Sequence, residues 1–102
     1  MFPILRKWLG RPLPQRTDLH FTMYTRMDCH LCADAWKLLT AHQKRRGFTL
    51  DKIDVDAAQD LVAQYGNCVP VVVVNGQVRF RGRVNEVLLR RILDAEYFLG
   101  RG

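Results

Sequence analysis

Apolar and polar positions alternate with a period of two in residues 19–25, which predicts a β-strand with Leu19, Phe21 and Met23 on one face. From residue 31 to residue 46 the apolar positions recur every three or four residues, which predicts a helix. The buried face of this helix is expected to carry Leu31, Ala35, Leu38, Leu39 and His42. The basic residues at 44–46 suit the negative end of the helix dipole, and Gly47 then stops the helix.

A second strand is predicted over residues 48–56, where β-branched and aromatic residues recur. Asp56, with Gln59 three residues later, has the spacing of a helix capping box. The helix that follows is expected to span residues 57–65 and to end at Gly66.

A hairpin and a last helix are predicted in the remainder of the chain. Residues 71–74 are apolar throughout, which favours a strand buried on both faces. The Asn75-Gly76 pair that follows is the strongest short hairpin signal. Asn85 is placed to cap a helix over residues 86–99. Its apolar face is expected to carry Leu88, Ile92, Ala95 and Leu99, before Gly100 ends it.

The elements therefore follow the order β-α-β-α-β-β-α. A helix between the first two strands implies a right-handed parallel crossover, and the hairpin adds an antiparallel pair. We expect an α/β fold in which a small mixed sheet has helices on both faces. The length of 102 residues suits one domain, which we place at residues 18–102 after an N-terminal extension of residues 1–17.

The extension begins with apolar residues that can form a short amphipathic segment, and Gly10, Pro12 and Pro14 then break it. We favour a tail that packs on the domain. A membrane-surface anchor and a partner-binding segment remain open alternatives. No stretch of the sequence is apolar enough to predict a transmembrane helix.

The segment YTRMDCHLCADAW, residues 24–36, carries the candidate chemistry, because Cys29 and Cys32 are separated by two residues. Such a pair is a metal clip, a structural disulfide or a working dithiol. The chain has three cysteines, an odd number, and no signal peptide is recognised. We therefore expect a cytoplasmic protein whose thiols stay mostly reduced, a setting in which a CxxC is more often catalytic or metal-binding.

Cys29 falls where a predicted strand gives way to a predicted helix. The unpaired N–H groups and the dipole of a helix N-terminus stabilise a thiolate, which is the nucleophile of disulfide exchange. Cys32 lies one turn further and can reach the sulfur of Cys29. We therefore predict that Cys29 attacks and that Cys32 resolves. Arg26 is expected to support the thiolate or to hold an anionic substrate.

Neighbouring charges modify this picture. Asp28 opposes a thiolate on Cys29 unless it points away or caps the helix, and His30 either tunes the pair or is an exposed spacer, which we favour. The net charge is +6, and the basic excess lies in residues 1–46, around and upstream of the CxxC. These basic side chains either form a solvated face or attract an acidic protein, glutathione or a membrane surface. Nucleic acid is not an expected partner, because aromatic and basic residues do not interleave.

Taken together, a strand, a CxxC that opens a helix, and a Val-Pro before a buried strand and hairpin resemble the glutaredoxin/thioredoxin family. The segments YTRMDCHLCADAWKLL and VPVVVVNGQ are similar, more narrowly, to those of the bacterial glutaredoxin-like proteins. The resemblance covers roughly residues 18–100. It implies the thioredoxin fold, with a four-stranded mixed sheet flanked by helices.

The resemblance also implies a substrate site. The Val69–Pro70 bond would be cis and would face the CxxC, and the backbone of Val69 would pair with a bound peptide or glutathione. Arg26 matches a basic residue that meets a glutathione carboxylate in glutaredoxins. His30 and Leu31, inside the motif, would complete the substrate-binding surface.

The chain departs from both groups of this family. His30 and Leu31 replace the Pro-Tyr that glutaredoxins commonly carry, and Gly82 stands alone where glutaredoxins have Gly-Gly and acidic residues for glutathione. Asp28 and Met23 stand where thioredoxins have a Trp and a buried Asp. The substrate is therefore expected to be a protein disulfide or a glutathione mixed disulfide, with protein disulfides preferred.

Cys68 lies two residues before Pro70 and is expected near the CxxC. We favour a small, inert core residue. It is otherwise an accessory thiol that exchanges with the pair, or the third ligand of a metal site made with Cys29, Cys32 and His30.

We therefore expect a monomeric glutaredoxin-like thiol–disulfide oxidoreductase with no bound cofactor and no resident metal. Its partner is expected to be a disulfide-containing protein or glutathione, the latter as co-substrate. A redox sensor or partner-binding module without turnover is the alternative, as is metal binding through Cys29, Cys32 and Cys68.

Overall fold

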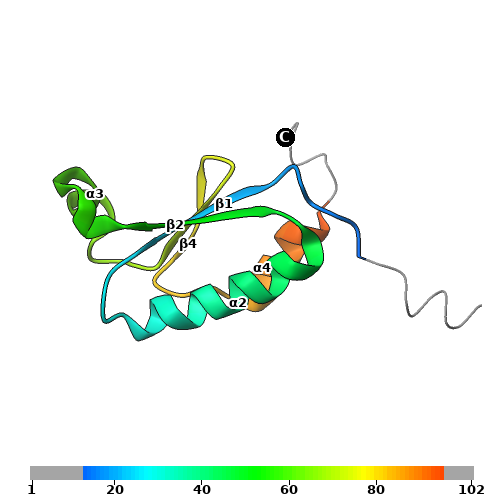
Figure 1. Cartoon of the computed structure of the whole chain (residues 1–102), viewed down its shortest axis with the longest axis horizontal. Coiled ribbons are helices and arrows are strands. Elements are labelled where there is room, and N and C mark those ends of the chain that lie inside the picture. The colour runs from blue at the N-terminus through cyan, green and yellow to red at the C-terminus, as the bar shows by residue number, and fades with distance from the viewer. Residues whose placement is uncertain (1–12, 96–102) are drawn as a thin grey trace, which may run out of the picture.

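The order of helices and strands agrees with the predicted order in a computed structural model that describes residues 13–95 (Figure 1). The elements are β1 (His20–Thr25), α2 (His30–Arg46), β2 (Thr49–Asp54), the 3₁₀ turn η1 (Val55–Ala57), α3 (Gln59–Tyr65), β3 (Val71–Val74), β4 (Gln77–Arg81) and α4 (Glu86–Asp94). The predicted amphipathic segment before Gly10, and the predicted helix positions 96–99, lie outside the described residues.

The four strands form one mixed sheet in the order β2-β1-β3-β4. β1 and β2 are parallel, whereas β3 is antiparallel to both β1 and β4. The predicted α/β fold, with a four-stranded mixed sheet flanked by helices, is confirmed. Because β1 and β2 run in the same direction and β3 runs against them, the ends of β1 and β2 meet the start of β3 at one end of the sheet. Tyr24 pairs there with Val71.

Helices cover both faces of this sheet. α2 and α4 lie together on one face, below the strands in Figure 1, and enclose the larger core with Phe21 and Met23. α3 packs on the other face, where Val55, Tyr65 and Val71 form a smaller core. The prediction that β3 is buried on both faces is confirmed, because its side chains alternate between the two cores.

The turn and the cap predicted in the second half of the chain are present. Asn75 and Gly76 both adopt positive φ, 50° and 85°, as the tight turn between β3 and β4 requires. The side chain of Asn85 accepts a hydrogen bond from the N–H of Leu88 at 3.0 Å and so caps α4.

Two predictions about helix ends are wrong. α3 begins at Gln59 with Ala58 as its N-cap, and the carboxylate of Asp56 binds Arg26 instead of a helix N-terminus. α4 ends at Asp94, because Ala95 has extended backbone with φ −68° and ψ 142°.

The expected buried faces of α2 and α4 are partly wrong. Leu31 is 41% exposed, whereas Cys32, one position further, is 3% exposed. The buried side chains of α2 are Cys32, Ala35, Leu39, His42 and Arg46, and those of α4 are Leu89, Ile92 and Leu93. The predicted helical spacing is therefore correct, but the buried face of each helix is centred on other residues than those predicted.

Residues 14–16, which the sequence places in the extension, bind the end of α2. The guanidinium of Arg46 donates to the carbonyl of Pro14 at 2.9 Å, and the N–H of Arg16 donates to the carbonyl of Arg46 at 2.6 Å. Both arginines are buried and both donate to the carbonyl of Leu93 at the end of α4. These contacts join the start of the described chain to the ends of α2 and α4.

Candidate functional site

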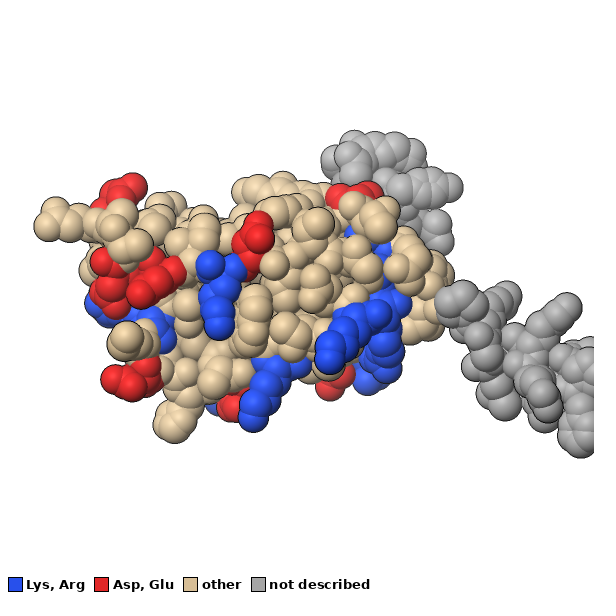
Figure 2. All heavy atoms as spheres, in the orientation of Figure 1, with Lys and Arg blue, Asp and Glu red and all other residues tan. Residues whose placement is uncertain are grey.

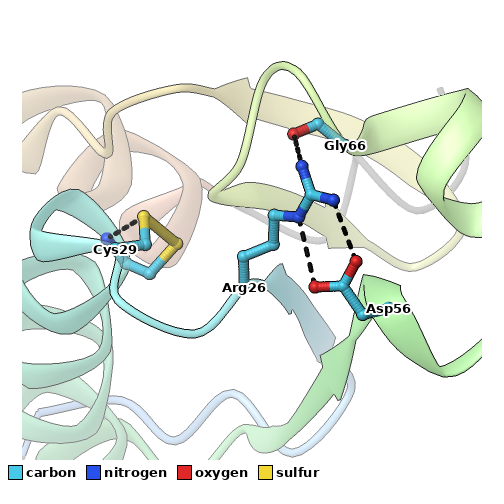
Figure 3. Close-up of a disulfide and its surroundings, with 5 residues drawn as sticks. Arg26, Cys29, Asp56 and Gly66 are labelled. Carbon is cyan, nitrogen blue, oxygen red and sulfur yellow. Dashed lines mark hydrogen bonds and ion pairs between the residues drawn. A yellow bond between two sulfur atoms is a disulfide. The ribbon is translucent and has the colours of Figure 1, made fainter.

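Cys29 and Cys32 form a disulfide at the N-terminus of α2, with their Cα atoms 5.2 Å apart (Figure 3). Cys29 is the N-cap of the helix, and its backbone is extended. Its sulfur accepts a hydrogen bond from the N–H of Cys32 at 3.1 Å, in the place where Ser or Asp oxygen usually accepts. The free N–H groups and the dipole of the helix are therefore directed at the sulfur of Cys29.

The two cysteines differ in exposure. Cys32 faces the larger core and is 3% exposed, whereas Cys29 is partly buried at its edge. The first turn of α2, a helix that lies wholly within the described residues, carries no acidic side chain. A reagent in solution therefore reaches Cys29 more readily than Cys32.

Val69 and Pro70 lie at the same end of the sheet as the disulfide. They directly precede β3, whose first residue, Val71, pairs with Tyr24 near the end of β1. The Val69–Pro70 bond is cis, Pro70 is buried, and Val69 packs against the same core as Cys29. Within the described residues, neither the N–H nor the C=O of Val69 has a hydrogen-bond partner. Both groups are therefore available to an extended segment of another molecule.

A pocket of about 380 Å³ lies against the disulfide, between α2 and β2. It is lined by Met23, Thr25, Arg26, Asp28, Cys29, Cys32, Ala33, Trp36, Lys37 and Lys52. The ammonium of Lys52 lies 4.4 Å from the centre of the Trp36 ring, within the range of a cation–π contact. Met23 is fully buried and gives the pocket an apolar floor, while the charged residues of its lining are three basic ones and Asp28.

The side chain of Arg26 is held by two groups of the same chain, Asp56 and Gly66. Its Nε and Nη2 donate to the two carboxylate oxygens of Asp56 at 3.2 and 2.9 Å, and its Nη1 donates to the carbonyl of Gly66 at 3.1 Å. Figure 3 shows the guanidinium directed toward Asp56 and Gly66 and away from the disulfide. The bond from Arg26 lowers the pKa of Asp56, and the same bond raises the pKa of Arg26.

The residues around the motif are exposed. Met27 is 77% exposed and Leu31 41%, and His30 and Asp28 also face solvent. Asp28 has a positive φ of 58°, which non-glycine residues seldom adopt, in the turn directly before Cys29. A second pocket of about 360 Å³ is lined by Leu31, Asp34, Ala35, Leu38, Arg83 and Val84. An apolar surface with scattered charges thus adjoins the partly buried Cys29.

Cys68 is a free, partly buried thiol. Its sulfur accepts a hydrogen bond from Nη1 of Arg81 at 3.8 Å, and its carbonyl accepts from the N–H of Gly82 at 2.9 Å. These contacts tie Cys68 to the strand β4. Between residues 13 and 95, no three His, Cys, Asp or Glu side chains are grouped so that they could hold a metal ion. The three-cysteine metal site therefore has no counterpart in the geometry.

Part of the basic excess of residues 1–46 lies far from the CxxC. Lys44, Arg45 and Arg46 lie in the last turn of this 17-residue helix, about 25 Å from Cys29 at 1.5 Å per residue. Figure 2 shows acidic side chains gathered, with some basic ones, at the end of the molecule that carries α3, and further basic side chains nearer the opposite end. None of the helices within the described residues is long and apolar enough to cross a membrane.

Asp56 is the residue of this site whose role the sequence analysis missed, because its spacing to Gln59 indicated a helix cap. A signal was nevertheless present. Arg26 follows β1 and Asp56 follows β2. The carboxyl ends of paired parallel strands lie side by side, so opposite charges just beyond them are placed to meet. The positions of Trp36 and Lys52 in the pocket gave no comparable signal.

Comparison with known proteins agrees with this geometry. The model of a family described as "Glutaredoxin-like domain (DUF836)" matches residues 20–94. An X-ray structure of a structural genomics target protein from X. campestris is 31% identical, with a TM-score of 0.59, and the match covers 74% of this chain and 97% of that chain. A solution NMR structure of a protein from Nitrosomonas europaea is 24% identical, with a TM-score of 0.66 and coverage of 74% and 92%. The curated proteins yield no match.

Proposed function

Because this chain belongs to the glutaredoxin-like domain family, we propose that it is a thiol–disulfide oxidoreductase whose working dithiol is Cys29 and Cys32. The observation that carries the proposal is the disulfide at the N-terminus of α2, in which the sulfur of Cys29 takes the place of a capping oxygen. A thiolate at that position gains the interaction of the helix dipole and of the N–H of Cys32. Cys29 is therefore the better nucleophile of the two.

The first step forms a mixed disulfide. The Cys29 thiolate attacks one sulfur of a substrate disulfide, that S–S bond breaks, and the other sulfur leaves as a thiolate that takes a proton from water. The partly buried Cys29 can be reached by the substrate, whereas Cys32 in the core cannot. One half of the substrate is then covalently bound to Cys29.

The second step closes the enzyme disulfide. Cys32 attacks the sulfur of Cys29, and the bound half of the substrate leaves as a thiolate that takes up the proton given up by Cys32. Counted from the dithiol with both thiols protonated, the enzyme has lost two electrons and two protons, and the substrate has gained the same number. Two molecules of glutathione, which become one glutathione disulfide, restore the dithiol.

Val69 and Pro70 form the platform for the substrate. The free N–H and C=O of Val69 pair with extended backbone beside the substrate cysteine, as strand addition does at a sheet edge. His30, Leu31 and the exposed Met27 provide side-chain contacts around Cys29. This apolar rim favours a protein disulfide as substrate, and glutathione acts as the reducing co-substrate.

Turnover measured with two substrates tests the proposal. One assay measures reduction of a glutathionylated peptide in the presence of glutathione, glutathione reductase and NADPH. The other measures reduction of a protein disulfide with the same three reagents. We expect the wild-type protein to turn over at least one substrate and Cys29→Ser to turn over neither, because only Cys29 starts the exchange.

Two results would count against this proposal. Activity of Cys29→Ser equal to that of the wild type would place the chemistry elsewhere in the chain. An inactive wild type whose Cys29 still alkylates rapidly at neutral pH would favour a redox sensor of the same fold, in which the dithiol changes partner binding without turnover.

A further inference from the structure

A single guanidinium joins three loops at the end of the sheet where the disulfide lies. Arg26 lies between β1 and Cys29, Asp56 lies in η1 after β2, and Gly66 follows α3. The bonds of 3.2, 2.9 and 3.1 Å from Arg26 connect all three (Figure 3). Only three residues separate Gly66 from Pro70, so the third loop is the one that carries the platform.

The geometry of this contact leaves Arg26 poorly placed to hold an anionic substrate. A carboxylate binds an arginine best through two parallel N–H bonds. Asp56 already occupies the Nε and Nη2 edge in that manner, and Gly66 takes Nη1. A substrate carboxylate would have to displace Asp56, whose carboxylate is itself held ionised because Arg26 lowers its pKa.

The two backbone segments that Arg26 connects depend on contacts with other parts of the chain to keep their conformation. Asp28, between Arg26 and Cys29, has the unfavourable positive φ of 58°. On the other side, the carbonyl of Gly66 lies at a helix end, where carbonyls lack partners within the helix. The bonds of Arg26 therefore fix the turn before Cys29 against the loop that leads to Val69.

We infer that Arg26 is a positioning residue for the proposed oxidoreductase, which holds Cys29 at a fixed separation from the Val69 platform through Asp56 and Gly66. The inference rests on the proposed function, because the separation matters only if a disulfide held on Val69 is attacked by Cys29. Displacement of a reacting group by about 1 Å can cost on the order of 100-fold in rate. Asp56 then contributes to turnover without touching the substrate.

Kinetics of matched variants test this inference. Arg26→Gln, Asp56→Asn and the double variant are compared using two glutathionylated peptides that differ only in carrying acidic or neutral side chains. We expect each single variant to lower kcat by about 10-fold with both peptides, because the geometry of attack is lost. The double variant should be no slower than either single variant, since both remove the same contact.

Three controls separate positioning from other roles. Arg26→Lys keeps the charge but not the planar fork, so it should not restore kcat. Arg90→Gln removes an arginine of another surface ion pair, with Glu86, and should match the wild type. The unfolding midpoint of every variant should stay close to that of the wild type, because Arg26 and Asp56 are 36% and 47% exposed and such pairs add little stability.

The inference is overturned if Arg26→Gln raises KM for the acidic peptide alone while Asp56→Asn leaves it unchanged or lowers it, since Arg26 would then bind the substrate. It is also overturned if both single variants match an active wild type. A wild type inactive with both peptides and with a protein disulfide would overturn the proposed function, and this inference with it.

Discussion

At the scale of single residues, the position of each cysteine on α2 decides what its sulfur can do. Cys29 lies at the cap, where a helix N–H reaches its sulfur, and Cys32 lies in the core one turn later. The sequence predicted that Cys29 attacks and Cys32 resolves because Cys29 stands at the exposed end of the predicted helix, with Cys32 one turn further. Cys68 is close in sequence to Pro70, and its hydrogen bonds are with Tyr65, Arg81 and Gly82.

Counting thiols checks this arrangement. The oxidised protein, denatured and alkylated, should carry one label, on Cys68, because Cys29 and Cys32 are paired. Treatment with a reductant before denaturation should raise the number to three. Peptide mass mapping that places the label on Cys29 or Cys32 of the oxidised protein would contradict the assignment.

The sequence was less informative about Arg26. Its position before Cys29 predicted support for the thiolate or an anionic substrate, and the resemblance implied a glutathione carboxylate, but neither indicated the contacts with Asp56 and Gly66. The contact joins residues 30 and 40 positions apart. It therefore depends on the parallel pairing of β1 and β2, which local patterns do not specify.

At the scale of elements, two buried arginines hold the end of α4 against the end of α2. Arg46 donates to the carbonyl of Leu93 at 2.6 Å and to the carboxylate of Asp94 at 2.8 Å. Arg16 donates to the carbonyls of Ile92, Leu93 and Ala95. The carbonyls at a helix end lack partners within the helix, so these arginines act as its cap.

Arg46→Met should destabilise the protein by about 3 kcal/mol, because it leaves buried carbonyls without a donor and removes charged hydrogen bonds. Arg45→Met, the exposed neighbour in the same helical turn, is the matched control and should change stability little. The free energy of unfolding in urea gives both values. Equal losses of unfolding free energy for the two substitutions would show that the buried contacts of Arg46 do not stabilise the protein.

A second link between these helices should make stability depend on pH. Nε2 of His42, which is buried in α2, donates to Oε2 of Glu86 at 2.9 Å, and this bond, with the charge of Arg90, lowers the pKa of Glu86 below its ordinary 4.5. A carboxyl with a lowered pKa stabilises the fold above its unfolded pKa, and this contribution is lost as pH falls through the folded value.

Glu86→Gln should therefore be less stable than the wild type at pH 6, and the difference should shrink as the pH falls below about 4.5. Unfolding midpoints measured from pH 3 to pH 7 give this comparison. A difference in midpoint between the two proteins that stays the same over the whole pH range would mean that the Glu86 carboxylate does not stabilise the contact between α2 and α4.

The local patterns located most elements. Period-two and helical spacing, the Asn75-Gly76 turn and the Asn85 cap each depend on a few neighbouring residues, so the sequence was sufficient for them. The end of α4 and the role of Asp56 depend on contacts with distant residues. Cys32 was not expected on the buried face of α2, because a cysteine adds little to a count of apolar positions.

At the scale of the whole molecule, the sheet order brings the candidate site together. The turn with Cys29 follows β1, η1 follows β2, and the platform precedes β3, so all three meet at one end of the sheet. The basic end of α2 lies at the other end. The charges of Lys44, Arg45 and Arg46 are therefore separated from the CxxC by the length of the helix, whereas Arg26 and Lys37 line the pocket beside it.

The most direct test of the central claim is to trap the first intermediate. Reduced Cys32→Ser protein is mixed with a disulfide-linked peptide, quenched with acid and mapped by mass spectrometry. The account predicts a mixed disulfide between the peptide and Cys29, in an amount that matches the amount of protein. The mixed disulfide is stable because the variant has no thiol at position 32 to displace the peptide. Peptide bound to Cys68, or no adduct at all, would contradict it.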